Sequence, residues 1–220
     1  MNITRREFTA GTGAFALALG MGLTSFPTAA LAQNPSTQEL AMPGPLPEMA
    51  IGDANAPVTI IEYASMTCSH CAHFHETTYP ELKKRYIDTG KVRFIFREFP
   101  LDDLAAAGFM LARCAVKDAP NSDKYFGVVD LLFSTQKNWT VNPPLPPLFN
   151  IVKQTGFTQE TFDACLANRQ LFAEVKQTRD RGAQKLGVAS TPTFFINGKK
   201  LPGALTIDQI EKEIQPYLKS

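Results

Sequence analysis

The chain has 220 residues, of which 22 are basic and 21 acidic, and 44% of its residues are apolar. This length suits one domain, with or without a sizeable insertion. The balanced charge, which includes no long basic run, argues against nucleic acid as a partner and favours a domain that meets proteins or small molecules.

The first 32 residues have the pattern of an export signal. Arg5 and Arg6 stand before an apolar stretch at about residues 14–23, and Ala30-Leu31-Ala32 offers small residues at a cleavage point. The arginine pair followed by Phe8 resembles a twin-arginine signal. The alternative is an uncleaved anchor, but the apolar stretch is short and broken by glycines, so it would not span a bilayer comfortably. We therefore expect a soluble mature protein outside the cytoplasm, most simply in a bacterial periplasm.

The first half of the mature chain predicts an arm and then a strand–helix–strand unit. Residues 33–57 are rich in proline and small side chains, which indicates a linker or an extended arm. β-Branched and aromatic residues at 58–63 predict a covered strand, and a second strand is expected at 91–97. A helix at about 69–86, kinked by Pro80, joins them. Strand, helix and strand in this short order predict a parallel βαβ unit.

The rest of the chain turns from helix back to sheet. Residues 101–186 are predicted to be helical throughout. A strand at 193–196, an Asn197-Gly198 hairpin turn and an amphipathic helix at 206–218 then form a ββα unit. We therefore expect an α/β fold in which a helical insertion divides one small mixed sheet. The domain that carries the sheet is expected to comprise residues 58–100 and 187–220.

Two of the four cysteines are close together, in the motif Cys68-Ser69-His70-Cys71, where the first strand gives way to a helix. The positive end of a helix stabilises the thiolate, which is the species that attacks disulfides. Cys68 is therefore the expected exposed nucleophile and Cys71 the more buried resolving thiol, in a site that needs no cofactor. His70 would favour the Cys68 thiolate through a hydrogen bond or a positive charge.

The same stretch also allows a metal site to be considered. Cys68, His70, Cys71, His73 and His75 are residue types that bind zinc or copper. On a helix, however, His73 and His75 point about 200° apart, so neither is placed to join Cys71 in one tetrahedron. We therefore expect no native metal and regard these two histidines as surface residues of the helix.

A second motif, Thr191-Pro192, stands before the strand at 193–196. A strand, a C-x-x-C helix, a second strand and a later Thr-Pro dipeptide that opens a hairpin resemble the thioredoxin fold. This resemblance implies that Pro192 is cis and lies against the reactive disulfide, with the backbone of Thr191 presented to a bound peptide.

The helical block between the second strand and the Thr-Pro motif resembles that of the DsbA family of periplasmic disulfide oxidases. The resemblance extends from about residue 57 to residue 218. His70 matches a histidine common between the family's cysteines, whereas Ser69 departs from the proline often found there, and this difference bears on the redox potential. Glu62, six residues before Cys68, matches the family's buried acid, which implies a role in proton transfer at the buried cysteine.

The remaining cysteines, Cys114 and Cys165, both fall in the predicted helical insertion. A bridge between them would close a loop of about 50 residues and stabilise the fold by roughly 4 kcal/mol on the chain-entropy account. The alternative is two separate buried thiols that act as small apolar side chains. An oxidising compartment favours the bridge, as a structural element rather than a second reactive site.

The sequence thus predicts a monomeric, exported thiol:disulfide oxidoreductase that introduces disulfides into exported proteins with free thiols. The family resemblance implies a membrane partner of the DsbB type that reoxidises the cysteine pair. A disulfide isomerase or a reductase remains an alternative, since threonine before the cis-proline occurs in isomerases of the superfamily. Isomerases usually carry a dimerisation domain, for which residues 33–57 are too short. A metal-binding chaperone is the non-enzymatic alternative.

Overall fold

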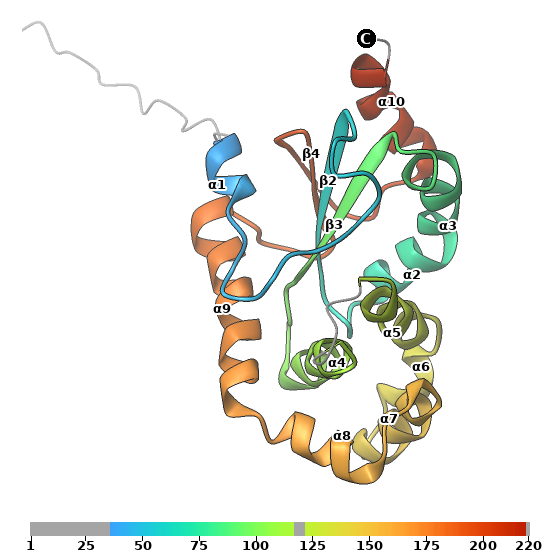
Figure 1. Ribbon diagram of the computed structural model, residues 1–220, viewed down its shortest axis with the longest axis vertical. Helices are drawn as coiled ribbons and strands as arrows, with labels where there is room; N and C mark the ends of the chain where they lie inside the picture. Colours follow the sequence, from blue (N-terminus) through green and yellow to red (C-terminus); the bar gives the residue numbers. More distant parts are fainter. Residues whose placement is uncertain (1–35, 117–121, 219–220) are drawn as a thin grey trace, which may run out of the picture. The chain divides into compact units, whose positions relative to one another are not determined.

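The computed structural model describes residues 36–116 and 122–218, and these residues include a five-stranded sheet of order β1-β3-β2-β4-β5 (Figure 1). The two long central strands, β2 and β3, are parallel, and the other neighbours pair antiparallel. The predicted signal peptide, residues 1–32, lies outside the described residues. The strands are β1 (Met49–Ile51), β2 (Val58–Ala64), β3 (Val92–Glu98), β4 (Thr193–Ile196) and β5 (Lys199–Pro202).

Helices join β2 to β3 and β3 to β4 and follow β5, so the expected α/β class is confirmed, with βαβ and ββα units on either side of a helical segment. None of the helices within the described ranges is long and apolar enough to cross a membrane. They are α1 (Thr37–Ala41), α2 (Ser69–Thr77), α3 (Tyr79–Leu82), α4 (Asp103–Cys114), α5 (Ser122–Ser134), α6 (Gln136–Trp139), α7 (Leu145–Val152), α8 (Gln159–Leu166), α9 (Arg169–Leu186) and α10 (Ile207–Leu218), with short π and 3₁₀ turns at Lys83–Ile87 and Lys153–Thr155.

The central strands are covered on both faces, as their apolar sequences predicted. Successive side chains of a strand point to opposite faces, so Ile61 and Tyr63 lie on one face of β2 while Ile60 and Glu62 lie on the other. The first face is covered by α1 and α9, which pack on Ile61 and Tyr63 (Figure 1). The second face is covered by α2, α3 and α10, and it is here that Glu62 is enclosed (Figure 1).

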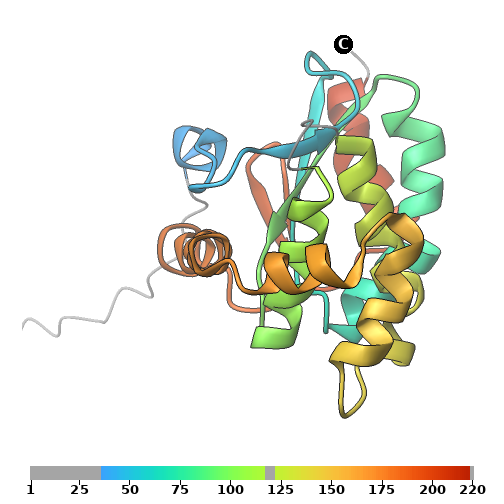
Figure 2. The ribbon, with the colours of Figure 1, turned by 60° about the horizontal axis from the view of Figure 1, so that its bottom comes forward.

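The helical segment shares one apolar core with the sheet. Figure 2 shows α4 and α5 beside the sheet, with α7 and α8 beyond them. Phe96 of β3 lies in edge contact with Tyr125 and Phe126 of α5 and with Phe109 of α4 across tilted rings. Because these rings are almost fully buried, the helices after β3 are anchored directly on the strand that precedes them.

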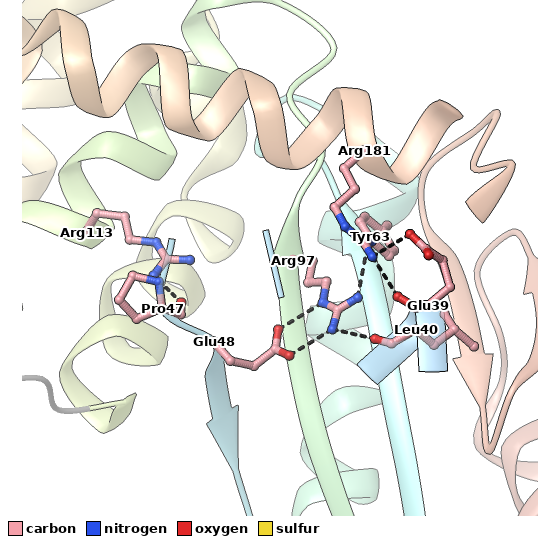
Figure 3. Close-up of polar contacts among 8 residues, drawn as sticks. All are labelled: Glu39, Leu40, Pro47, Glu48, Tyr63, Arg97, Arg113 and Arg181. Atoms are coloured by element: carbon pink, nitrogen blue, oxygen red, sulfur yellow. Dashed lines mark hydrogen bonds and ion pairs between the residues drawn. The ribbon is translucent and has the colours of Figure 1, made fainter. Parts of the chain in front are cut away.

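The arm before β2 is more ordered than its sequence predicted, since it carries α1 and β1. β1 pairs with β3 and so extends the sheet by one strand. Arg97 of β3 ties the arm down: its guanidinium donates to both carboxylate oxygens of Glu48 (2.9 and 2.8 Å), to the Leu40 carbonyl (2.8 Å) and to the Tyr63 hydroxyl (3.1 Å), as Figure 3 shows. A strand of three residues is too short to show an alternating pattern in the sequence, and the arginine that fixes the arm lies about 50 residues further along the chain.

The helix expected at 69–86 is interrupted earlier than predicted. α2 ends at Thr77, and a new helix, α3, begins after Thr78. Pro80 stands in the first turn of α3, and because it has no N–H it interrupts the helical hydrogen bonds at the junction of α2 and α3. Thr78 keeps a right-handed helical backbone, and the helical hydrogen bonds from Thr78 N–H to the Phe74 carbonyl and from Leu82 N–H to the Thr78 carbonyl continue across it. The proline therefore breaks the hydrogen-bond ladder within a continuing helical run, in line with the expected kink.

Gly182 of α9 rests against the ring of Tyr63, and we expect Gly182→Ala to destabilise the protein by about 1–3 kcal/mol. A Cβ atom at this position would meet Tyr63 Cε1 at 2.8 Å and Cδ1 at 3.1 Å. The ring is held by Arg97 and by edge contacts with Phe99 and Phe195, so it cannot yield easily. Urea unfolding measures the effect.

Gly127 of α5 provides the matched control. A Cβ atom added there meets nothing within 4 Å, so Gly127→Ala should stabilise its helix by about 0.5–1 kcal/mol. If both substitutions stabilise the protein equally, α9 does not depend on close contact with Tyr63.

Candidate active site

The loop after β2 delivers Cys68 to the N-terminus of α2. The Cys68 N–H donates to the Ser65 carbonyl at 3.1 Å, and Cys68 is the N-cap residue of the helix. Cys71 lies one turn further on, and the two cysteines are free thiols in this structure. Cys68 keeps a small exposed fraction of 9%, whereas Cys71 is fully enclosed. The strand–loop–helix arrangement thus buries both cysteines but leaves Cys68 a narrow contact with solvent, which the fully enclosed Cys71 lacks.

The surroundings of Cys68 favour its thiolate. A hydrogen bond from the Cys71 thiol is the largest influence, and with help from Thr191 and the backbone N–H groups of His70 and Cys71 it overcomes burial and lowers the pKa of Cys68 to about 5. Burial raises the pKa of Cys71, and the nearby Glu62 adds to this effect. Cys68 is therefore charged at neutral pH while Cys71 keeps its proton, an asymmetry suited to a nucleophile and a resolving thiol.

The Thr191–Pro192 peptide bond is cis, and the loop that contains it lies against Cys68. The Cys68 thiol, when protonated, donates to the Thr191 carbonyl at 3.3 Å. The Thr191 hydroxyl is buried and has no hydrogen-bond partner among the described residues, so it is available to donate to the Cys68 sulfur. The structure therefore brings together the two motifs that the sequence singled out 123 residues apart.

Gln136 of α6 supports the reactive loop and was missed in the sequence. Its buried amide donates to the carbonyls of Met66 (2.8 Å) and Cys68 (3.1 Å), which fixes the backbone on both sides of Thr67. The Thr67 hydroxyl in turn donates to Asp102 at 2.7 Å. A single glutamine that follows a long helix carries no sequence signal of such a role, because its partners lie some 70 residues away.

Glu62 is fully buried, and its carboxylate Oε2 lies 2.9 Å from Nε2 of His75. The prediction that His75 is a surface residue is therefore wrong. His75 follows Cys71 by four residues and so lies on the same face of α2, the face that packs on the sheet. Its ring stacks on Phe133 at 4.4 Å and is only 7% exposed as a residue. The spacing from Cys71 was the signal that could have revealed this position.

The other two histidines are exposed. His73 points away from the sheet, as expected of a surface helix residue. Among the described residues the His70 imidazole makes no hydrogen bond to Cys68, and it is the His70 backbone N–H that stabilises the thiolate. Ser69 is likewise exposed at the helix start. His70, His73 and His75 diverge, and no three His, Cys, Asp or Glu side chains of the described residues converge in a way that could hold a metal ion.

The second cysteine pair forms a disulfide that joins α4 to α8. Cys114 and Cys165 have their Cα atoms 6.2 Å apart and are separated by 51 residues in the sequence. The bridge therefore holds two helices of the segment inserted between β3 and β4, away from the Cys68 motif in the chain.

Comparison with known proteins agrees with this architecture. The protein family described as Thioredoxin matches residues 46–216. A Rickettsia conorii protein named "Putative protein-disulfide oxidoreductase" is 34% identical over 174 residues, which are 78% of this chain and 60% of the relative. The "Probable disulfide bond formation protein D" of Bacillus anthracis is 31% identical, over 78% of this chain and 79% of its own. The chain thus spans about three fifths of the length of its rickettsial relatives.

Solved structures point to the same group. The crystal structure of Wolbachia pipientis alpha-DsbA1 is 30% identical and superposes with a TM-score of 0.75, over 84% of this chain and 97% of that chain. BdbD from Bacillus subtilis, at 24% identity and a TM-score of 0.68, shares the fold. With its reactive-site geometry and these relatives, the chain belongs to the thioredoxin family, in the DsbA-like group.

Proposed function

We propose that this protein is an exported thiol:disulfide oxidoreductase that introduces disulfide bonds into other exported proteins through Cys68 and Cys71. The observation that carries the proposal is the contrast between the two thiols. The pKa of Cys68 is lowered to about 5, whereas burial raises that of Cys71. The names of the relatives from Rickettsia and Bacillus support exchange chemistry of this kind.

The exchange proceeds in two steps from the oxidised Cys68–Cys71 disulfide. A substrate thiolate attacks Cys68 Sγ, the Cys68–Cys71 bond breaks, and Cys71 leaves as a thiolate that takes up a proton. A second thiolate of the substrate then attacks the substrate sulfur of the mixed disulfide, and Cys68 leaves as a thiolate. Two electrons pass from the substrate dithiol to the cysteine pair. A low thiol pKa makes Cys68 a good leaving group in the second step.

The direction of the reaction follows from the stabilised thiolate. Whatever stabilises the Cys68 thiolate stabilises the reduced pair, and a stabilised reduced pair makes its disulfide a stronger oxidant. The Thr191 loop, which touches Cys68, would hold the substrate peptide beside the sulfur. The family resemblance supports reoxidation by a membrane partner of the DsbB type and a periplasmic location. The Arg5-Arg6 pair supports export by a twin-arginine signal in residues 1–32, and the protein is proposed to act as a monomer.

Equilibration of the purified protein with glutathione buffers, with alkylation to resolve the state of Cys68, tests this proposal. We expect a reduction potential well above the value of about −270 mV that is typical of thioredoxin. Cys68→Ser should abolish exchange, while the Cys114–Cys165 bridge stays intact. A thioredoxin-like potential would instead assign the protein to the reductases, which give electrons to substrate disulfides rather than take them from substrate dithiols.

A further inference from the structure

A line of polar groups runs from Glu62, whose charge acts on the buried Cys71 thiol, out to another surface of the molecule. Glu62 Oε2 and His75 Nε2 are 2.9 Å apart, and their side chains are 0% and 2% exposed. On the other side of the ring, His75 Nδ1 lies 3.5 Å from Asp130 Oδ1. That is an ion-pair contact, and a shift of about 0.5 Å would make it a hydrogen bond. The Asp130 side chain is 48% exposed, so the line ends in solvent.

The setting of this line is apolar. The His75 ring stacks on Phe133, meets Phe96 edge-on, and lies beside Phe74 and Tyr79. An ion pair in such a place is costly to desolvate and is often no more stabilising than apolar side chains of the same size. The second carboxylate oxygen of Glu62, Oε1, is also buried and has no hydrogen-bond partner among the described residues. A contribution to folding stability therefore does not by itself explain why Glu62 and His75 are buried here.

The outer end of the line opens away from the substrate side. A surface cavity of about 340 Å³ is lined by His75, Tyr79, Lys83, Asp130 and Phe133, among others. These residues come from α2, α5 and the segment around α3, whereas Cys68 meets the Thr191 loop. Water can thus reach Asp130 while a peptide covers Cys68.

Exchange at this site requires a proton at an enclosed sulfur. Cys71 is fully buried, and a substrate bound over Cys68 would close its nearest way to water. When the Cys68–Cys71 bond breaks, the Cys71 thiolate must gain one proton. In the reverse direction the Cys71 thiol must lose one before it can attack Cys68 Sγ.

We propose that Glu62, His75 and Asp130 form a proton path that connects Cys71 with solvent at the cavity between α2 and α5. This proposal rests on the proposed function. Proton exchange between Glu62 and Cys71 is the role that the family resemblance implies for the buried acid. The new part is that His75 and Asp130, as positioning residues that act through Glu62, connect it with solvent. On reduction, one proton passes from the Glu62–His75 pair to the Cys71 thiolate, and the pair regains one from water through Asp130. On reoxidation the proton travels the opposite way.

The charge state of the pair suits this role. Burial raises the pKa of Glu62, and although burial acts against a charge on His75, the carboxylates of Glu62 and Asp130 raise its pKa to about 9. Both shifts keep a proton on the pair at neutral pH. The other titratable groups that face His75 at the cavity are the buried Tyr79 hydroxyl, whose pKa is raised by burial, and the exposed Glu76 and Lys83, of which Lys83 pairs with Asp88.

His75→Gln tests the path, because glutamine can still hydrogen-bond to Glu62 but cannot pass a proton on. The reduced protein is mixed with oxidised glutathione, and two steps are followed over a range of pH. In the first step the Cys68 thiolate forms a mixed disulfide, which needs no proton from Cys71. In the second step Cys71 loses its proton and releases glutathione. We expect His75→Gln to leave the first rate within about twofold and to slow the second at least about 10-fold at neutral pH.

His73→Gln, an exposed histidine on the same helix, is the matched control and should change neither rate. Asp130→Asn, at a half-exposed position, should slow the second step alone even if His75→Gln fails to fold. Unchanged second-step rates in both His75→Gln and Asp130→Asn would overturn the proposal, as would equal slowing of both steps. The glutathione equilibrium of the wild-type protein, taken from the same titration, tests the proposed function separately.

Discussion

The reduced protein is expected to lose up to about 3 kcal/mol of stability from one group, Cys68, as the pH falls from about 7 to about 4. The hydrogen bond from Cys71, together with Thr191 and the helix N–H groups, lowers the folded-state pKa of Cys68 from 9.0 to about 5. A group whose folded pKa is depressed contributes stability that is fully present above its unfolded pKa. That stability is lost as the pH falls through the folded pKa.

The two pKa values of Cys68, in the folded and the unfolded protein, determine the pH range over which this stability is lost. At pH 7 the Cys68 thiol is ionised in the folded protein and protonated in the unfolded chain. The stabilisation at this pH therefore corresponds to the difference of about two units between pH 7 and the folded-state pKa of about 5, at about 1.4 kcal/mol per unit. Urea unfolding of the reduced protein at a series of pH values gives the total change. The same series on reduced Cys68→Ser removes the contributions of all other groups. Partial contact of the sulfur with solvent makes about 3 kcal/mol an upper limit.

The ultraviolet absorbance of the thiolate provides a direct check, and it should rise in one step with a midpoint near pH 5. Cys71→Ser keeps a donor to Cys68, so its midpoint should stay low, whereas Cys71→Ala removes that donor and should raise the midpoint. A single step near the ordinary thiol pKa in the wild-type protein would show that the dithiol does not hold a thiolate.

The parts of the site that could be predicted from the sequence are those indicated by patterns among residues close together in the chain. The Cys68-Ser69-His70-Cys71 motif lies between a predicted strand and a predicted helix, and Thr191-Pro192 precedes a predicted hairpin. The neighbouring sequence therefore predicts the structure around each motif. Glu62 stands inside an apolar strand, which indicated burial before any contact was known. The strand register then places Glu62 on the face covered by α2, as two-residue alternation requires.

The parts that could not be predicted depend on contacts between distant segments. Gln136 reaches the reactive loop only because α6 folds back over it, and β1 exists only because β3 is there to pair with it. His75 is an intermediate case. Its position four residues after Cys71 places it on the buried face of α2. A polar side chain on a short helix is nevertheless usually exposed, and the burial of His75 is explained only by its partner Glu62.

Arg113→Met is expected to destabilise the protein by about 3–5 kcal/mol, because it would leave the carboxylate of Glu98 buried without its cation. The Arg113 guanidinium donates to Glu98 Oε1 through Nε at 2.6 Å, and the Tyr125 hydroxyl donates to the same oxygen at 2.9 Å. The Glu98 side chain is 1% exposed, and its other oxygen has no partner among the described residues. Water therefore cannot replace the lost contact. Urea unfolding measures the loss.

Two comparisons separate this effect from the loss of arginine packing. The double variant Glu98→Gln/Arg113→Met should recover much of the stability, since the amide is neutral and still accepts from the Tyr125 hydroxyl. Arg97→Met should cost less than Arg113→Met, although Arg97 makes more hydrogen bonds, because its partner Glu48 is 20% exposed and can be hydrated (Figure 3). Equal losses at the two arginines would mean that the number of bonds, rather than the burial of the carboxylate left behind, sets the energy. Unequal losses in the expected order would identify Glu98, which ends the strand next to β2, as the charge on which the packing of α4 and α5 depends.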